Sequence, residues 1–157
     1  MIEVPSSSVE ETERIAAELA RGLETGDVVA VTGELGSGKT TFVRGACRAL
    51  GVTSPVTSPT YAIGHRYRGQ VEVSHLDLYR LTTLAEEDWA DLEAYFEDAI
   101  AFVEWPEVAG ASLPSPRARV SLRLVGPRHR LIAVEVYGKP LEIPLSTRAD
   151  TGVRHRD

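Results

Sequence analysis

The order of apolar and polar positions in the first third of the chain predicts a helix, a strand and a second helix. Apolar residues recur at helical spacing over 9–23, after serines that can cap a helix. The residues expected on the buried face of this helix are Val9, Thr12, Ile15, Ala16, Leu19 and Leu23. The β-branched run 27–32 predicts a strand buried on both faces. Helical spacing returns over 42–50, and Gly51 stands where the C-terminal cap is expected.

The middle of the chain predicts a hairpin, a helix and another strand. Segments 61–67 and 71–76 flank the turn 68–70 and favour a β-hairpin. Segment 84–97 is acidic and helical in pattern. The wholly apolar run 99–103 predicts a second central strand.

Two loops and a closing strand pair complete the pattern. Segment 52–60 holds two prolines and many hydroxyl residues, which favour a loop, and 108–116 is also expected to be a loop. Segments 119–125 and 131–137 alternate between apolar and polar residues, which predicts an antiparallel pair. The polar tail 147–157 is expected to be disordered.

The loop between the first strand and the second helix carries the most informative motif. Residues 33–40 read Gly-Glu-Leu-Gly-Ser-Gly-Lys-Thr, which matches the phosphate-binding P-loop G-x-x-x-x-G-K-[ST]. Glycines let successive N–H groups point at one anion, and the N-terminus of the following helix adds positive potential. The alternative is a glycine-rich turn with an incidental lysine, but the strand before the loop and the helix after it favour the P-loop.

The motif makes a nucleoside triphosphate the leading ligand. Lys39 can reach the β- and γ-phosphates, and the Thr40 hydroxyl can ligate Mg²⁺. The chain contains no asparagine, so the Asn-Lys-x-Asp motif that reads guanine in GTPases is missing and ATP is favoured over GTP. The residues expected to bind the nucleotide are Gly33, Glu34, Leu35, Gly36, Ser37, Gly38, Lys39, Thr40, Thr41 and Trp105.

Two carboxylates stand where a triphosphate site needs a group for Mg²⁺ or its water. Glu104 ends the buried strand 99–103, and Asp77 ends the strand 71–76. For Asp77, a helix cap or a pairing with Arg80 remains an alternative. We expect Lys39, Asp77, Glu104 and Thr60 to act in catalysis, and Thr40 and Glu104 to ligate the metal.

Three other residues near the site allow two interpretations each. Thr60, in the proline-containing loop, is a candidate switch residue for Mg²⁺ or the γ-phosphate, or part of an ordinary turn. His75 is a candidate proton shuttle, although a hydrogen-bonded structural histidine is favoured. Trp105 could cover the site or stack on a base, or it could pack against the core.

Composition indicates an ordinary globular protein. At 157 residues the expected organisation is a single P-loop NTPase-like domain over 1–146, of the α/β class, with a mostly parallel central sheet, antiparallel edge strands and flanking helices. The net charge of −6 argues against gripping nucleic acid by phosphate neutralisation alone. The single cysteine, Cys47, is expected to be a buried apolar residue. The sequence shows no signal peptide or membrane span, so we expect a cytoplasmic location without membrane contact.

The motifs together resemble the bacterial TsaE family (also called YjeE), the small ATPase of tRNA threonylcarbamoyladenosine synthesis. The similar segments, in the family's order, are 33–42, Arg44-Gly45, Ser58-Pro59-Thr60-Tyr61, His75-Leu76-Asp77-Leu78-Tyr79-Arg80-Leu81 and Val103-Glu104-Trp105-Pro106-Glu107. The family often has a Leu-Gly pair where this chain reads Ala90-Asp91-Leu92-Glu93, and the basic tail after Thr147 matches nothing that we can name.

This resemblance implies ATP with Mg²⁺, slow hydrolysis by the chain alone, and activation by partner subunits. It implies TsaD-like and TsaB-like partners, and contact with tRNA only through that complex. By resemblance, Thr40 and Glu104 map to Mg²⁺ ligation, Thr60 to a switch-like loop, and Asp77 and Trp105 to positions near the site. Two alternatives remain, a small nucleoside or metabolite kinase and a non-catalytic ATP-dependent adaptor. About fifty residues follow Glu104, which leaves little room for the lid of a kinase.

Overall fold

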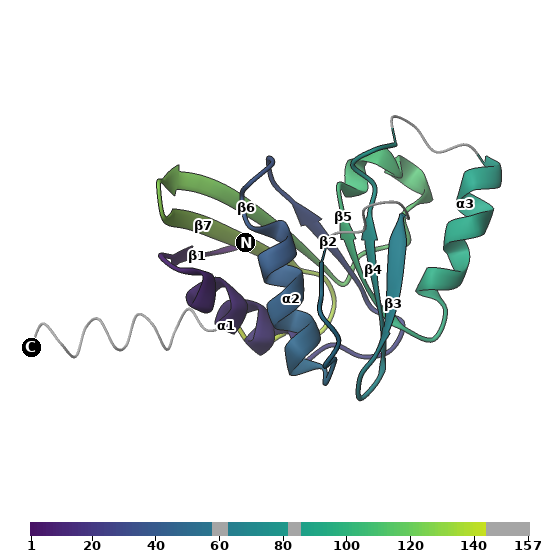
Figure 1. The fold of residues 1–157 in the computed structure, drawn as a ribbon, viewed down its shortest axis with the longest axis horizontal. Helices are drawn as coiled ribbons and strands as arrows, with labels where there is room; N and C mark the ends of the chain where they lie inside the picture. The colour runs from purple at the N-terminus through teal and green to yellow at the C-terminus, as the bar shows by residue number, and fades with distance from the viewer. Residues whose placement is uncertain (58–62, 82–85, 144–157) are drawn as a thin grey trace, which may run out of the picture.

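One sheet runs through the protein, and its parallel strands lie at the centre. The computed structural model describes residues 1–57, 63–81 and 86–143. Within these ranges the sheet has seven strands, in the order β1-β7-β6-β2-β5-β4-β3 (Figure 1). They are β1 (Ile2–Ser6), β2 (Val28–Thr32), β3 (Gly64–Arg68), β4 (Glu72–Asp77), β5 (Ile100–Glu104), β6 (Ala118–Gly126) and β7 (His129–Val136). The four neighbours β6, β2, β5 and β4 are mutually parallel, whereas β1, β7 and β3 pair antiparallel.

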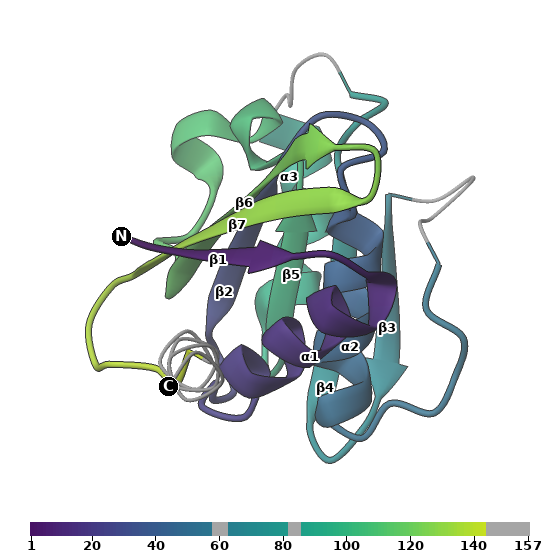
Figure 2. The same cartoon turned by 90° about the vertical axis from the view of Figure 1, so that its left-hand side faces the viewer.

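Helices cover both faces of this sheet. α1 (Val9–Ala20) and α2 (Lys39–Ala49) pack against each other on one face, and α3 (Glu86–Leu92) lies over the other (Figure 1). The described part of the chain also contains the short 3₁₀ helices η1 (Glu93–Phe96), η2 (Pro106–Val108) and η3 (Gly110–Ser112). Figure 2 shows β1 lying alongside β7 on the strand edge nearest to α1. This arrangement explains why the central strands are apolar on both faces, since each face is covered by helices.

The start of α1 is fixed by two reciprocal side-chain contacts. Ser8 is the N-cap residue, and its hydroxyl accepts a hydrogen bond from the Glu11 backbone N–H at 3.0 Å. The Glu11 carboxylate in turn accepts from the Ser7 backbone N–H at 2.7 Å. The first contact satisfies a backbone donor that a helix leaves without a partner in its first turn, and the second ties the residue before the cap to that turn.

Close contact between α1 and α2 depends on Gly45. A Cβ atom at this position would lie 2.5 Å from the Cα and carbonyl oxygen of Glu13, which are backbone atoms of α1. Only glycine therefore allows the two helices to approach at this point. The contact fixes α2, and with it the loop that precedes α2.

The core consists of two apolar layers, one on each side of the sheet. The larger layer joins α1 and α2 to residues such as Val29, Val31 and Phe102. The smaller joins Leu92 of α3 to the opposite sides of β2 and β5, including Ala101 and Val103. Because successive side chains of a strand point to opposite faces, these two strands contribute to both layers.

The predicted α/β class, with its mostly parallel centre and antiparallel edges, is confirmed. β2 and β5 are neighbouring parallel strands, 64–68 and 72–77 form the expected hairpin, and β6 and β7 form the expected pair. Gly51 has a φ of +90°, as expected for a residue just beyond the end of a helix. No helix in the described ranges combines the length and the apolar character needed to cross a membrane.

Several expectations about local structure were wrong. Strand β1 was not anticipated, and Val9 is 53% exposed rather than on the buried face of α1. In the acidic segment, α3 ends at Leu92 and continues as a 3₁₀ turn. The loop expected over 108–116 is confirmed, and it includes the 3₁₀ turn η3. The tail 147–157 lies outside the described residues.

Candidate functional site

The loop over 33–38 lies between the end of β2 and the start of α2, at the carboxyl ends of the parallel strands. Open α/β sheets bind ligands at this edge. Gly38 is the N-cap residue of α2 and adopts a φ of +105°, which favours glycine. A Cβ atom on Gly33 would collide with the side chain of Ser37 and with the Leu122 carbonyl oxygen. The glycine spacing is therefore a steric requirement of this loop.

Lys39, the first residue of α2, turns its side chain back across the loop. Its side chain is mostly buried, at 5% exposed, and its ammonium donates to the carbonyl oxygens of Gly33 and Glu34 at 2.7 and 3.0 Å. The same nitrogen lies 4.6 Å from the centroid of the Trp105 ring, a cation–π contact. Burial lowers the pKa of Lys39, and the nearby carboxylates of Glu104 and Asp77 oppose this shift.

Glu104 is the last residue of β5 and is almost fully buried, with 2% exposed. One of its carboxylate oxygens accepts a hydrogen bond from the Thr40 hydroxyl at 3.2 Å and lies 2.5 Å from His75 Nε2. His75 is on the neighbouring strand β4, opposite Phe102, so that His75 and Glu104 lie diagonally on the same face of the sheet. His75 is hydrogen-bonded, as was favoured from the sequence.

Asp77 lies directly opposite Glu104 in the register of β4 and β5. Its carboxylate accepts from the Tyr79 backbone N–H at 3.0 Å. Burial raises the pKa of Asp77 and the nearby Glu104 carboxylate adds to this, whereas the Tyr79 N–H lowers it. Two carboxylates are thus held side by side at the end of the sheet, where a cation would relieve their repulsion.

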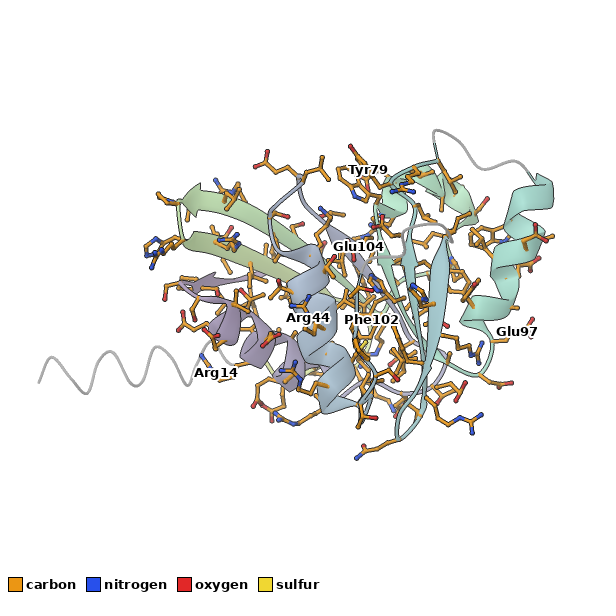
Figure 3. The ribbon with its side chains drawn as sticks, in the orientation of Figure 1. Arg14, Arg44, Tyr79, Glu97, Phe102 and Glu104 are labelled. Atoms are coloured by element: carbon orange, nitrogen blue, oxygen red, sulfur yellow. The ribbon has the colours of Figure 1, made fainter. Side chains whose placement is uncertain are left out.

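These side chains surround a pocket of about 380 Å³. Its lining residues are Leu35, Gly36, Gly38, Lys39, Thr40, Thr41, Asp77, Tyr79, Glu104, Trp105 and Arg130. Figure 3 shows Tyr79 and Glu104 toward the same end of the sheet, beyond Phe102. Hydroxyl and carboxylate oxygens are suitable ligands for Mg²⁺, and a lysine beside a glycine-rich helix start suits a polyphosphate, so this donor set fits both.

Trp105 has an uncommon backbone conformation at the border of this pocket. Its φ of 57° and ψ of 50° are left-handed, and Pro106 follows at the start of η2. The chain therefore turns sharply after β5, and the Trp105 ring packs on both Lys39 and Tyr79. Left-handed backbone in a bulky residue is costly and occurs preferentially at ligand sites.

A second pocket, of about 340 Å³, adjoins the first at Gly38, Thr41 and Arg130. Its lining residues are Ser7, Ser8, Val9, Thr12, Gly38, Thr41, Pro127, Arg128 and Arg130. It therefore lies between the start of α1, the start of α2 and the β6–β7 turn. The exposed Val9 forms part of its wall, which accounts for the misplacement of this residue in the sequence-based prediction.

The structure brings most of the predicted site residues together, with some differences. Gly33, Glu34 and Ser37 do not line the pocket beside the glycine-rich loop, although Gly33 and Glu34 hold the lysine through their carbonyl oxygens. Thr60 lies outside the described residues. Cys47 is buried, as expected, and burial raises the pKa of its thiol to about 12.

Arg130 was not among the site residues predicted from the sequence. This half-buried residue of β7 donates from Nε to the Ser37 carbonyl oxygen at 2.9 Å and from Nη2 to the Gly36 carbonyl oxygen at 3.2 Å. It lines both pockets. A single arginine in a strand pattern carries no local signal of such a contact, because the contact depends on the pairing of distant strands.

Comparison with known proteins gives one consistent family. The family described as "Threonylcarbamoyl adenosine biosynthesis protein TsaE" matches residues 6–132. A Treponema pallidum protein named "tRNA threonylcarbamoyladenosine biosynthesis protein TsaE" is 36% identical over 132 residues, covering 82% of this chain and 96% of that protein. The Bacillus subtilis protein of the same name is 35% identical over 136 residues, 85% of each chain. The crystal structure of Bacillus subtilis YdiB is similar at a TM-score of 0.73 and 27% identity, covering 99% of this chain and 96% of that one.

The sheet order, the glycine-rich loop and the lysine that follows it define an α/β protein with a P-loop-like fold. The sequence matches extend over most of the chain, and the chain belongs to the TsaE family.

Proposed function

We propose that the protein is the Mg²⁺-dependent ATPase subunit in the biosynthesis of tRNA threonylcarbamoyladenosine, the modified adenosine next to the anticodon. The observation that carries the proposal is the grouping of Lys39, Thr40 and Glu104 around one pocket at the start of α2. Membership in the TsaE family supports the pathway, and the pocket supports the chemistry.

The phosphates would be held by the backbone amides of the glycine-rich loop and by the Lys39 ammonium. Thr40 and Glu104 would hold Mg²⁺. Asp77 would lie close to this ion because it is opposite Glu104 in the sheet. Mg²⁺, when bound, supplies positive charge that neutralises the phosphate oxygens during phosphoryl transfer. Lys39 now donates to two loop carbonyl oxygens, so its ammonium is already inside the loop and can exchange those partners for phosphate oxygens.

The nucleoside would occupy the second pocket. The two pockets meet at Gly38 and Thr41, so one bound nucleotide would span both of them along the surface of the loop. The mixed wall of hydroxyl and apolar groups suits a sugar and a base.

Weak activity of the isolated chain is part of the proposal. An arginine can speed phosphoryl transfer by stabilising the charge of the transition state. Arg44 is engaged away from the pocket, where it donates to the Val56 carbonyl oxygen and pairs with Glu13. Arg130 is engaged with carbonyl oxygens of the loop. We therefore expect TsaD-like and TsaB-like partners to complete the site, with tRNA contacted through that complex, in the cytoplasm. The net charge of −6 agrees with indirect contact.

The decisive experiment is ATP hydrolysis by the purified chain with Mg²⁺, alone and with the TsaB-like and TsaD-like proteins of the same organism. Slow turnover that rises when both partners are added is the expected result. Transfer of the γ-phosphate to a nucleoside or metabolite instead of water would replace the proposal with a kinase. Tight ATP binding with no turnover in either condition would replace it with an adaptor. Chelation of Mg²⁺ must abolish the turnover that is seen.

A further inference from the structure

The contact between Arg130 and the phosphate loop joins parts of the protein that are remote in sequence. Arg130 lies on β7, 93 positions after Ser37, and donates to the carbonyl oxygens of two successive residues, Gly36 and Ser37. Charge-assisted hydrogen bonds of this kind are stronger than those between neutral groups. The guanidinium therefore holds the middle of the loop from the sheet.

The geometry of the peptide unit shows what this contact controls. The Ser37 carbonyl belongs to the same planar peptide as the Gly38 N–H, and in a trans peptide the two point in opposite directions. A guanidinium bound to the carbonyl consequently fixes the N–H on the other side. The Gly36 carbonyl likewise belongs to the peptide of the Ser37 N–H, which donates to the Glu34 carbonyl oxygen at 3.1 Å. The Gly36–Ser37 peptide is thus held at both its carbonyl and its N–H, and the Ser37–Gly38 peptide is held at its carbonyl.

Gly38 provides the space for the guanidinium. A Cβ atom at Gly38 would lie 3.3 Å from Arg130 Nε and 3.5 Å from a methyl carbon of Leu122. The arginine side chain therefore lies against the backbone of the loop at the N-terminus of α2. Its positive charge also adds to the positive potential of that helix end.

We propose that Arg130 is a positioning residue, which presets the P-loop so that the Gly38 amide faces the phosphate of an incoming nucleoside triphosphate. The inference rests on the proposed function in that the ligand is ATP. It predicts that the loop is held before ATP arrives, and that the planar two-donor shape of the side chain matters as well as its charge.

The test compares Arg130→Lys with the parent chain and with Arg123→Ala. Lysine keeps the positive charge but has no planar fork with which to donate to two successive carbonyl oxygens. Arg123 is an exposed residue of the neighbouring strand β6, outside both pockets, so its removal controls for the loss of one positive charge. Arg130→Gln gives a second variant, without charge, should the lysine variant be unstable. Thermal unfolding checks the fold of each.

Two measurements are needed, hydrogen exchange of the backbone amides over 33–39 without nucleotide, and the Kd for ATP with Mg²⁺. We expect faster exchange in this loop and about tenfold weaker ATP binding in Arg130→Lys, the order of one lost charge-assisted hydrogen bond. Arg130→Gln should lose more, and Arg123→Ala should match the parent. The midpoint of unfolding should stay close to that of the parent in the lysine variant.

Two results would overturn the inference. Parent-like exchange and affinity in Arg130→Lys would show that the fork does not preset the loop. Weaker ATP binding with unchanged exchange would make Arg130 a direct ligand of the nucleotide instead. A parent chain that fails to bind ATP would contradict the proposed function, whereas the exchange measurement needs no nucleotide and would still test the role of Arg130.

Discussion

Replacement of Glu104 separates its role in turnover from its role in the fold. The carboxylate accepts from the Thr40 hydroxyl at 3.2 Å and contacts His75 Nε2 at 2.5 Å, while His75 is fully buried. In Glu104→Gln, the amide oxygen can still accept a hydrogen bond from His75, so the local structure is retained. The negative charge that would hold Mg²⁺ is lost.

The expected magnitudes differ between two substitutions. Loss of one preorganised electrostatic group at a reacting centre typically costs about 100-fold or more in turnover. We therefore expect Glu104→Gln to lose about 100-fold in turnover with a smaller change in ATP affinity, and to unfold within about 1 kcal/mol of the parent. Glu104→Ala should lose similar turnover but also about 1–3 kcal/mol of stability, because it leaves the buried His75 nitrogen without this partner.

The assay is phosphate release with saturating ATP and Mg²⁺, in the presence of the partner proteins if they activate the parent. ATP affinity is measured separately by calorimetry, and stability by urea unfolding. Glu24→Gln, an exposed residue in the turn before β2, is the matched control and should behave as the parent. Equal turnover in Glu104→Gln and the parent would contradict a role for the Glu104 charge in turnover, as would a loss of ATP affinity as large as the loss of turnover.

Three further predictions concern single residues. Lys39→Ala should weaken ATP binding by about tenfold or more, because it removes a buried ammonium from the pocket proposed to hold the phosphates, and this is measured by titration with ATP. Asp77→Asn should stabilise the ATP-free chain at pH 7. Burial raises the pKa of Asp77 in the folded chain, so the folded chain becomes less stable as the pH rises through that pKa and the carboxyl ionises. Asparagine does not ionise and therefore avoids this loss of folding stability. Urea unfolding at several pH values measures the effect. Cys47, whose thiol pKa is raised to about 12, should resist alkylation by iodoacetamide at pH 8 in the folded chain and react in urea.

Each of these outcomes can fail in a distinct way. Unchanged affinity in Lys39→Ala would remove this residue from the phosphate site. A stabilising effect of Asp77→Asn that stays constant as the pH is lowered would not come from ionisation of Asp77. Rapid alkylation of Cys47 without denaturant would contradict the packing of α2 against the sheet.

Much of the local structure around the glycine-rich loop could be predicted from the sequence because its parts are adjacent in the chain. The glycine spacing, the lysine and the helix that follows occupy consecutive residues, and each depends on backbone conformations that neighbours dictate. The position of Glu104 at the end of a central strand could be predicted because an apolar run buried on both faces identifies such a strand.

The same locality accounts for the errors. β1 pairs with β7, with Ile2 opposite Val134, so its stability comes from residues that no short window contains. Val9 follows the apolar spacing of α1, yet it lies at the first residue of that helix, beside a pocket rather than over the sheet. Periodicity identifies the apolar face of a helix, but it does not show how far along the helix that face is covered by the sheet.

The α/β class, the glycine-rich loop with its lysine, and the family could all be predicted from the sequence, since they depend on short-range spacing and on the order of motifs. The contact between His75 and Glu104, the position of Asp77 opposite Glu104, and the hydrogen bonds from Arg130 to the loop could be found from the fold but not from the sequence. These contacts arise from the register of paired strands. Register is set by burial and pairing across the whole sheet, and not by the residues adjacent in the chain.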